Sequence, residues 1–133
     1  MTHIKLITLV DDDEVFVFLT KSIIKQTQIP VKISTFGNGF DALQFIKENY
    51  DKVEVLPEVI LLDLSMPIMN GWQFLNEFCR IAPRAGKKIT VYICSSSISP
   101  DDVARAKTYD TVSDYIIKPV TKDKLLTLLS GIE

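Results

Sequence analysis

Residues 59–71 have the sequence VILLDLSMPIMNG, which begins with four apolar residues in a row and continues with Asp63. A strand that is apolar at every position, and not only at alternate ones, is typical of a parallel sheet covered on both faces. Asn70 and Gly71 then precede a segment whose apolar residues repeat with helical spacing. The stretch therefore predicts a buried strand that ends at a carboxylate, followed by a loop and a helix.

The same alternation of apolar run and helical pattern continues in both directions along the chain. The strands are expected at residues 4–10, 31–36, 59–63, 89–94 and 114–118. The helices are expected at residues 14–27, 40–49, 71–82, from 99 onward and at 121–130. Regular alternation of strand and helix is typical of a parallel sheet with helices on both faces and right-handed crossovers. We therefore predict a doubly wound α/β fold of five βα units.

Local signals add detail to two of the helices and two of the loops. The first helix is indicated by apolar residues at near-helical spacing, which are Val15, Phe16, Leu19 and Ile23. Before the fourth helix, Ser99 is expected to cap the helix, and Asp102 to complete a capping box. The long connections 49–58 and 82–88 are expected to be solvated loops.

The composition excludes several classes of protein. The chain has 133 residues, of which 47% are hydrophobic and 24% charged, so we expect one globular domain. A net charge of −2 provides no general basic surface for nucleic acid. The longest apolar runs are about six residues, far below the roughly 18 of a membrane-spanning helix. Because the N-terminus also lacks the features of a signal peptide, we expect a cytoplasmic protein.

The cysteines and the histidine argue against two further kinds of site. Cys79 and Cys94 do not form a CxxC motif, and both are expected to be small buried apolar residues. His3 is the only histidine. A zinc site or a histidine-based catalytic triad is therefore not expected.

Polar side chains follow four of the five expected strands. Asp11 and Asp12 follow the first strand, and Asp63 ends the third. Ser95 follows the fourth strand, and Lys118 ends the fifth. In open parallel sheets, binding sites form at the carboxyl ends of the strands. Three carboxylates, a hydroxyl and a lysine are therefore expected to converge at one edge of the sheet.

Three neighbouring carboxylates restrict the chemistry of such a site. Like charges at this separation cost several kcal/mol at low dielectric, unless one carboxyl is protonated or a cation binds. Oxygen ligands favour Mg²⁺ over zinc. Since Mg²⁺ needs only one or two carboxylates, a third can act as a nucleophile and form an aspartyl phosphate. A lysine and a hydroxyl can then bind the phosphoryl oxygens, so we predict phosphoryl transfer to an aspartate.

The motifs LVDD, VILLDLSMPIMNG, YICSSS and DYIIKP closely resemble, in order and spacing, the receiver domains of two-component response regulators. The most specific piece is Asp63 followed by Pro67 and then by Asn70 and Gly71. The resemblance covers essentially the whole chain and implies a flavodoxin-like sheet with strand order 2-1-3-4-5, as in chemotaxis regulators. It also implies a single receiver domain over residues 1–133 with no output domain, and we expect a stand-alone response regulator.

The resemblance implies a metal site and a phosphoacceptor. Asp63 corresponds to the aspartate that is phosphorylated. Asp11 and Asp12 correspond to the acidic pair that binds Mg²⁺, with Asp12 the more direct ligand. Ser65 occupies the position whose backbone carbonyl binds the metal. Asp13 follows the acidic pair and is expected to cap the next helix without touching the metal.

The resemblance also implies the residues of the switch. Ser95 corresponds to the hydroxyl that moves to bind the phosphoryl group, and the backbone amide of Ser96 is expected to contact the same group. Lys118 corresponds to the lysine that pairs with phosphate, and Pro119 to a proline preceded by a cis bond. Tyr115 corresponds to the aromatic residue that turns inward when the hydroxyl moves.

The function implied is a phosphorylation switch and not a metabolic enzyme. A sensor histidine kinase or a histidine phosphotransfer protein would supply the phosphoryl group. A protein target would bind the surface formed by the fourth helix, the fifth strand and the fifth helix. The domain would assist its own dephosphorylation and exist as a monomer or weak dimer, without direct contact with nucleic acid or membrane.

Two alternatives remain open at this stage. The chain could be an interaction module on a receiver scaffold that is never phosphorylated. It could also be a Mg²⁺-dependent phosphohydrolase that forms an aspartyl phosphate. Such enzymes resemble a DxD pattern, and the second acid of that pattern is replaced here by Ser65.

Overall fold

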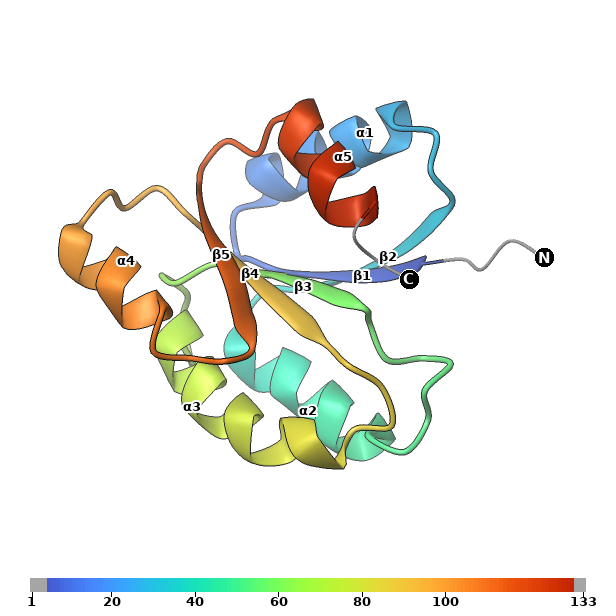
Figure 1. Ribbon diagram of the computed structural model, residues 1–133, viewed down its shortest axis with the longest axis vertical. Helices are drawn as coiled ribbons and strands as arrows, with labels where there is room; N and C mark the ends of the chain where they lie inside the picture. The colour runs from blue at the N-terminus through green and yellow to red at the C-terminus, as the bar shows by residue number, and fades with distance from the viewer. Residues whose placement is uncertain (1–4, 131–133) are drawn as a thin grey trace.

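The central strand of the sheet is β3 (Val59–Leu62), which is buried at all four of its positions. The computed structural model describes residues 5–130 (Figure 1). The other strands are β1 (Lys5–Val10), β2 (Val31–Phe36), β4 (Thr90–Ser95) and β5 (Val112–Ile117). Every neighbouring pair is parallel, in the order β2-β1-β3-β4-β5. This order confirms the predicted doubly wound fold.

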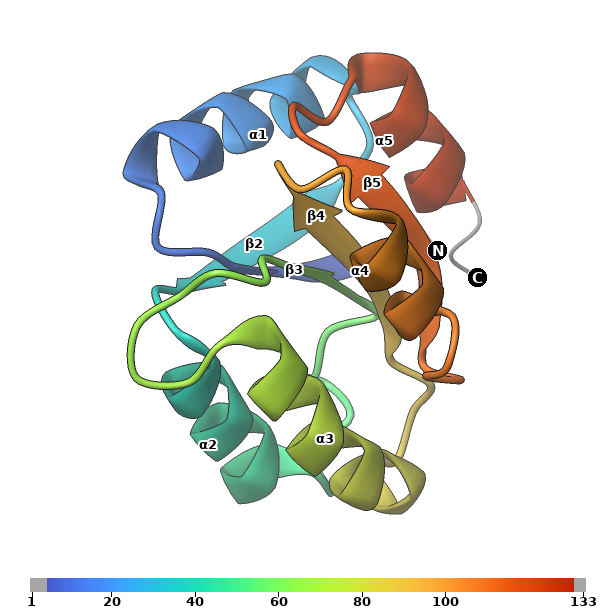
Figure 2. The ribbon, with the colours of Figure 1, turned by 90° about the vertical axis from the view of Figure 1, so that its left-hand side faces the viewer.

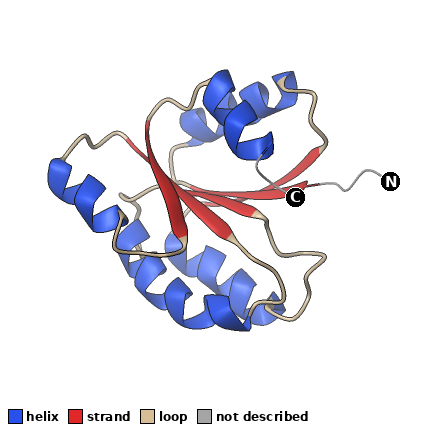
Figure 3. Ribbon diagram, in the orientation of Figure 1, coloured by secondary structure: helices blue, strands red, loops and turns tan. Residues whose placement is uncertain are grey.

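Helices cover both faces of the sheet (Figures 1 and 3). Helices α1 (Glu14–Gln26) and α5 (Lys122–Ser130) lie on one face. Helices α2 (Gly39–Asn49) and α3 (Gly71–Ile81) lie on the other, and a short 3₁₀ helix (Ala82–Arg84) follows α3. Helix α4 (Pro100–Ala106) joins the second layer through Ala106. Figure 2 looks toward the edge at which the strands end.

Two apolar cores hold the layers together. Phe74 and Phe78 of α3 are fully buried and stack on each other beneath the sheet, with their ring centroids 5.4 Å apart. Leu125 and Leu129 of α5 are fully buried on the opposite face. Each such side chain stabilises the fold by about 1.5–3 kcal/mol. The sheet between the cores is therefore a rigid base for the loops at its edge.

The apolar residues that indicated helix α1 are not all buried. The buried residues of α1 are Phe16, Thr20 and Ile24. The exposed fractions of Val15 and Leu19 are 67% and 51%, and Ile23 is half-buried. Phe18 is also 71% exposed. This helix carries apolar residues on more than one face, so apolar spacing alone could not identify the buried stripe.

The predicted capping box of α4 was also wrong. The Ser99 side chain makes no capping hydrogen bond. The hydroxyl of Ser97 instead accepts from the N–H of Ser99 at 3.2 Å and donates to Oδ2 of Asp102 at 2.8 Å. The carboxylate that was expected to cap therefore binds a residue in the loop before the helix.

The two long connections pack against each other and are not simply solvated. Leu56 and Pro57 of the first connection are buried. Lys87 of the second donates to the carbonyl of Leu56 at 2.7 Å and forms an ion pair with Glu58 at 3.2 Å. This pair closes the end of the sheet opposite the edge at which the strands end.

Three further observations complete the fold. Cys94 is buried as expected, whereas Cys79 is only half-buried. His3 lies outside the described residues. Within residues 5–130, no helix combines the length and the apolar character needed to cross a membrane.

Candidate functional site

The register of the parallel strands brings the acidic residues together. Val10 of β1 and Leu62 of β3 are register partners. Asp11 and Asp63 follow them, so both carboxylates emerge from the sheet at the same level. The N–H of Asp63 donates to the carbonyl of Val10 at 2.9 Å, which holds the two strand ends together.

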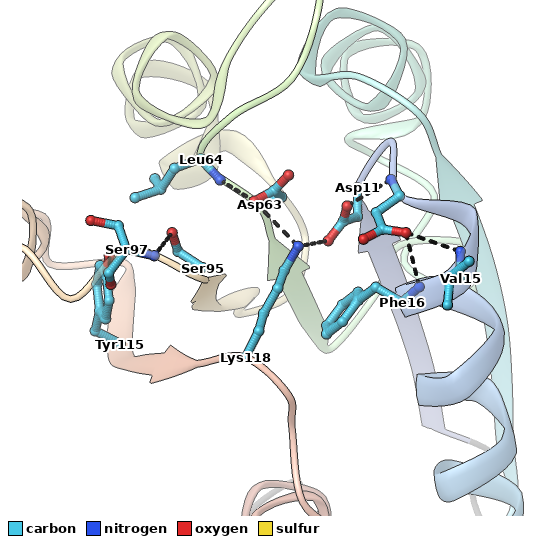
Figure 4. A network of polar contacts seen from close by, with 10 residues as sticks. Asp11, Val15, Phe16, Asp63, Leu64, Ser95, Ser97, Tyr115 and Lys118 are labelled. Carbon is cyan, nitrogen blue, oxygen red and sulfur yellow. Dashed lines mark hydrogen bonds and ion pairs between the residues drawn. The ribbon is translucent and has the colours of Figure 1, made fainter.

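The register of β4 and β5 brings the Ser95 hydroxyl and Lys118 together in the same way. Ser95 of β4 is the register partner of Ile117 in β5. The N–H of Lys118 donates to the carbonyl of Ser95 at 2.9 Å. The peptide bond between Lys118 and Pro119 is cis, in agreement with the sequence-based expectation. The lysine therefore leaves the strand beside the hydroxyl and reaches toward the acids (Figure 4).

The three predicted metal-binding side chains form one cluster. Carboxylate oxygens of Asp11, Asp12 and Asp63 all lie within 4.8 Å of one another. Asp11 and Asp63 are buried, whereas Asp12 is exposed. Oδ2 of Asp11 is buried, and the Lys118 ammonium lies 2.8 Å from it. An all-oxygen donor set that is open on one side fits Mg²⁺, which keeps several of its own waters.

Lys118 is held among acids and one aromatic ring. Its ammonium lies 2.8 Å from Oδ2 of Asp11 and 3.6 Å from Oδ1 of Asp63. It also lies 4.3 Å from the ring centroid of Phe16, a cation–π contact. Burial lowers the pKa of Lys118, but the hydrogen bond to Asp11 and the acidic charges outweigh this effect and raise it. The side chain is therefore a fixed positive charge.

The environment of Asp63 disfavours its charged form. Burial of the carboxyl, and then the nearby charge of Asp11, raise the pKa of Asp63 to about 6. Lys118 and the backbone N–H groups of Ser65 and Leu64 act in the opposite direction. The N–H of Leu64 donates to Oδ1 of Asp63 at 2.9 Å. Added positive charge beside Asp63 would therefore favour the ionised, nucleophilic form.

A cavity of about 440 Å³ opens on the other side of Asp63. Its wall includes Asp63, Ser65, Ser95, Ser96, Trp72 and Asp102. Ser95 is buried and Ser96 exposed. The cavity has room for a phosphoryl group beside the carboxylate. The hydroxyl of Ser95 and the backbone amide of Ser96 were predicted to bind the phosphoryl group, and both residues line this cavity.

The predicted aromatic residue is connected to this cavity through a loop. The Ser95 hydroxyl accepts from the N–H of Ser97 at 3.0 Å. The hydroxyl of Tyr115 donates to the carbonyl of Ser97 at 2.9 Å. Tyr115 is half-buried and packs against the core on the α2 and α3 side. Ser97 therefore links the two residues expected to switch (Figure 4).

Asp13 caps α1, as predicted. Its Oδ1 accepts from the N–H of Val15 at 3.0 Å and of Phe16 at 3.2 Å. Its own N–H donates to Oδ1 of Asp11 at 2.9 Å. Asp13 does not belong to the carboxylate cluster found among the described residues. It orients the carboxylate of Asp11 and fixes the first turn of the helix.

Gly71 lets the loop after β3 return close to the phosphoacceptor candidate. A Cβ at this position would lie 2.5 Å from the carbonyl oxygen of Asp63. The N–H of Gly71 donates to the carbonyl of Leu64 at 3.0 Å. Asn70 caps α3 in a capping box with Gln73. The Asn-Gly pair therefore joins the end of β3 directly to the start of α3.

Sequence reasoning missed three residues of the site. Phe16 was noted only for its helical spacing, and its contact with Lys118 joins residues far apart in the chain. Asp102 was interpreted only as part of a helix cap, and Trp72 was given no role in the site, yet both line the cavity. Their proximity to Asp63 depends on how α3 and α4 pack, for which a local pattern gives no signal.

The fold and the site together define a class of protein. A parallel sheet of order β2-β1-β3-β4-β5 with an acidic cluster, a buried hydroxyl and a lysine at its carboxyl edge is the architecture of a receiver domain. The chain matches the response regulator receiver domain family over residues 7–130. The chain belongs to this family, whose members are signalling domains of two-component systems that bind Mg²⁺ at an acidic cluster.

Individual relatives agree with this assignment. The chain is 30% identical to the chemotaxis protein CheY of Listeria monocytogenes, over 91% of this chain and 92% of that protein. A two-component response regulator from Cytophaga hutchinsonii shares 32% identity over 98% of each chain, with a TM-score of 0.87. The phosphorylated cyanobacterial phytochrome response regulator RcpA shares 28% identity over 98% of this chain and 92% of that one, with a TM-score of 0.76.

Proposed function

We propose that the protein is a phosphorylation switch in which Asp63 accepts a phosphoryl group from a phosphohistidine. The donor is a sensor histidine kinase or a histidine phosphotransfer protein. The observation that carries the proposal is the placement of Asp63, between the acidic cluster and Lys118 on one side and an open cavity on the other. The solved relative in a phosphorylated form supports it.

The side chains of Asp11, Asp12 and Asp63 and the carbonyl of Ser65 would hold Mg²⁺. When bound, the ion supplies positive charge that offsets the repulsion among the acids and the phosphoryl oxygens. The carboxylate cluster supports this assignment, because three acids whose oxygens lie within 4.8 Å of one another repel unless a cation binds among them.

In the transfer step, an oxygen of ionised Asp63 attacks phosphorus and forms the O–P bond. The N–P bond of the phosphohistidine breaks, and its electron pair returns to the imidazole nitrogen. Lys118 offsets the charge on the phosphoryl oxygens, and the Ser95 hydroxyl and the Ser96 amide donate to them. Ser65 lines the cavity and is small, so water can reach the acyl phosphate and the domain assists its own dephosphorylation.

The switch follows from the hydrogen bonds of the β4–α4 loop. The Ser95 hydroxyl accepts from the N–H of Ser97, so movement of this hydroxyl toward the phosphoryl group also moves the loop. The carbonyl of Ser97 holds the hydroxyl of Tyr115, whose ring already packs against the core, so movement of the loop changes the position of this ring. The surface formed by α4, β5 and α5 changes with it and binds a downstream protein.

The phosphodonor docks on the exposed apolar face of α1. This face is formed by Val15, Phe18 and Leu19, which are all exposed. Large apolar side chains gathered on a surface are typical of a site that binds another protein. Phe18 and Asp12 line a common cavity of about 390 Å³, so the face is continuous with the metal cluster.

We place the protein in the cytoplasm as a monomer or weak dimer that acts through protein partners.

The test is incubation with Mg²⁺ and acetyl phosphate, followed by intact-mass measurement. One phosphoryl adduct is expected on the wild-type protein and none on Asp63→Asn or in excess EDTA. No adduct and no Mg²⁺ binding would instead support an interaction module. Steady turnover of a phosphate ester would support a phosphohydrolase, against which the serine at position 65 already argues.

A further inference from the structure

A second carboxylate, in addition to Asp63, lies in the wall of the cavity. Asp102 belongs to the first turn of α4 and lines this cavity together with Ser95 and Ser97. It is half-buried, and its Oδ2 accepts from the Ser97 hydroxyl at 2.8 Å. It does not belong to the carboxylate cluster found among the described residues. A carboxylate is an unexpected group in a cavity that is to receive a phosphoryl group.

Ser97 connects this carboxylate to the residues of the switch. Its N–H donates to the Ser95 hydroxyl at 3.0 Å, and its carbonyl accepts from Tyr115 at 2.9 Å. Its hydroxyl is the group that Asp102 holds. All three polar groups of Ser97 are thus used, and Asp102 fixes the loop that Ser95 and Tyr115 share.

Helix α4 is tied to the cavity at its other end as well. The guanidinium of Arg105 lies 4.4 Å from the ring centroid of Trp72, which lines the same cavity. Tyr109 stacks on Trp72 with centroids 6.0 Å apart, and its hydroxyl donates to Asn76 of α3 at 2.6 Å. A shift of α4 therefore changes the surroundings of Trp72, the only tryptophan of the chain.

We propose that Asp102 is a positioning residue that holds the β4–α4 loop through Ser97 and so opposes binding of a phosphoryl group beside Asp63. This inference rests on the proposed phosphorylation of Asp63. Phosphorylation adds about −1 to −2 of charge. That charge enters the cavity that Asp102 lines, so the two groups repel each other. The hydrogen bond between Asp102 and Ser97 is weakened, and the loop and α4 are released together. The carboxylate thus sets how readily the switch turns on.

A matched control exists in the same turn of the helix. Asp101 is exposed, has the same charge and does not line the cavity. Both aspartates are favourable at the N-terminus of α4 through the helix dipole. A role confined to the helix dipole or to net charge would therefore give Asp101→Asn and Asp102→Asn the same effect. A role in the switch distinguishes them.

The experiment measures binding of beryllofluoride, an analogue of the phosphoryl group, in the presence of Mg²⁺. Trp72 fluorescence reports binding, and ¹⁹F NMR of the bound fluoride provides a second readout. Asp102→Asn is expected to bind roughly fivefold more tightly than the wild type, since coupling between sites is typically of this order or larger. Asp101→Asn is expected to match the wild type. Mg²⁺ affinity without beryllofluoride is expected to be the same in all three proteins.

A double-mutant cycle tests the route through Ser97. Ser97→Ala is also expected to tighten beryllofluoride binding, and the double substitution with Asp102→Asn to add less than the sum of the two. Non-additivity is the signature of one shared interaction. Urea unfolding of each variant measures its stability, which separates an effect on binding from an effect on folding.

Three outcomes would overturn the inference. Equal or weaker binding by Asp102→Asn would show that the carboxylate does not oppose the phosphoryl group. An equal gain in Asp101→Asn would assign the effect to net charge. No binding by the wild-type protein would remove the proposed function and, with it, the inference. In the first two outcomes the wild-type protein still binds, so the proposed function stands.

Discussion

The ammonium of Lys118 lies 2.8 Å from Oδ2 of Asp11 but 3.6 Å from Oδ1 of Asp63. The lysine is thus paired more closely with a proposed metal ligand than with the proposed phosphoacceptor. The positive charge of Lys118 is shared between two buried carboxylates. The pKa of Asp63 therefore stays raised, although the lysine acts to lower it. The relation has consequences for reactivity and for stability.

Removal of the Lys118 charge should slow phosphorylation of Asp63. In Lys118→Met, the phosphoryl oxygens lose a charged partner, and we expect the initial rate with acetyl phosphate to fall by about 100-fold. The rate is measured by intact mass at fixed Mg²⁺. Lys124→Met is the control, because Lys124 forms an exposed ion pair with Asp114. A similar loss in both variants would contradict a specific role for Lys118.

Substitution of Asp63, the proposed phosphoacceptor, should stabilise the metal-free protein. The pKa of Asp63 is raised to about 6, so the folded state holds the proton more tightly than the unfolded state. Its contribution is present below the unfolded value of 3.8 and is lost as pH rises through 6. In EDTA at pH 7, Asp63→Asn should therefore raise the free energy of unfolding by on the order of 2 kcal/mol. Urea unfolding should show the difference shrinking below pH 4; a constant difference would contradict the cause.

Neighbouring acids of the first loop should have separate effects. Asp12→Ala removes a ligand of the cluster and should abolish Mg²⁺-dependent phosphorylation. Asp13→Ala removes the cap of α1 and should cost about 1 kcal/mol of stability. Calorimetric Mg²⁺ titration and urea unfolding of both variants check this division. Loss of metal binding in Asp13→Ala alone would place the metal ligand one residue later.

Gly71 should not tolerate a side chain. The Cβ of Gly71→Ala would meet the carbonyl oxygen of Asp63 at 2.5 Å, so backbone must move. We expect a loss of about 1–3 kcal/mol in the free energy of unfolding, together with slower phosphorylation. Gly37→Ala is the matched control, because its Cβ would meet nothing within 4 Å. Equal stability of the two variants would contradict the close approach.

The two cysteines should differ in reactivity. Burial raises the pKa of the Cys94 thiol to about 12, whereas Cys79 is half-buried. Because the thiolate is the nucleophile, iodoacetamide at pH 8 should modify Cys79 and spare Cys94. Peptide mapping of the native protein identifies the modified residue. Modification of both is expected only in urea, and modification of Cys94 under native conditions would be inconsistent with its burial.

Much of the site was predictable because its determinants are local. The apolar run before Asp63 indicated a strand covered on both faces, and β3 is buried at every position. Parallel strands place their carboxyl ends at one edge, so residues that follow different strands could be grouped without knowledge of the packing. Asp11, Asp12 and Asp63 do form one cluster. The cap at Asp13 also follows from local sequence and was confirmed.

The errors occurred where two local interpretations compete. Helix α1 carries apolar residues on several faces, and only packing against the sheet selected Phe16 and Ile24 over Val15 and Leu19. Asp102 suits a capping box by spacing. In the folded protein it binds the Ser97 hydroxyl, since the loop brings that donor within 2.8 Å.

The sequence by itself determined the order of the elements, the parallel sheet and the chemical groups at its edge, because apolar periodicity and strand direction are local properties. Only the tertiary structure decided how those groups meet. The contact of Lys118 with Phe16, the half-buried Asp102 in the cavity wall and the stack of Trp72 with Tyr109 join different elements. Their geometry depends on the packing of whole helices against the sheet, which local patterns do not specify.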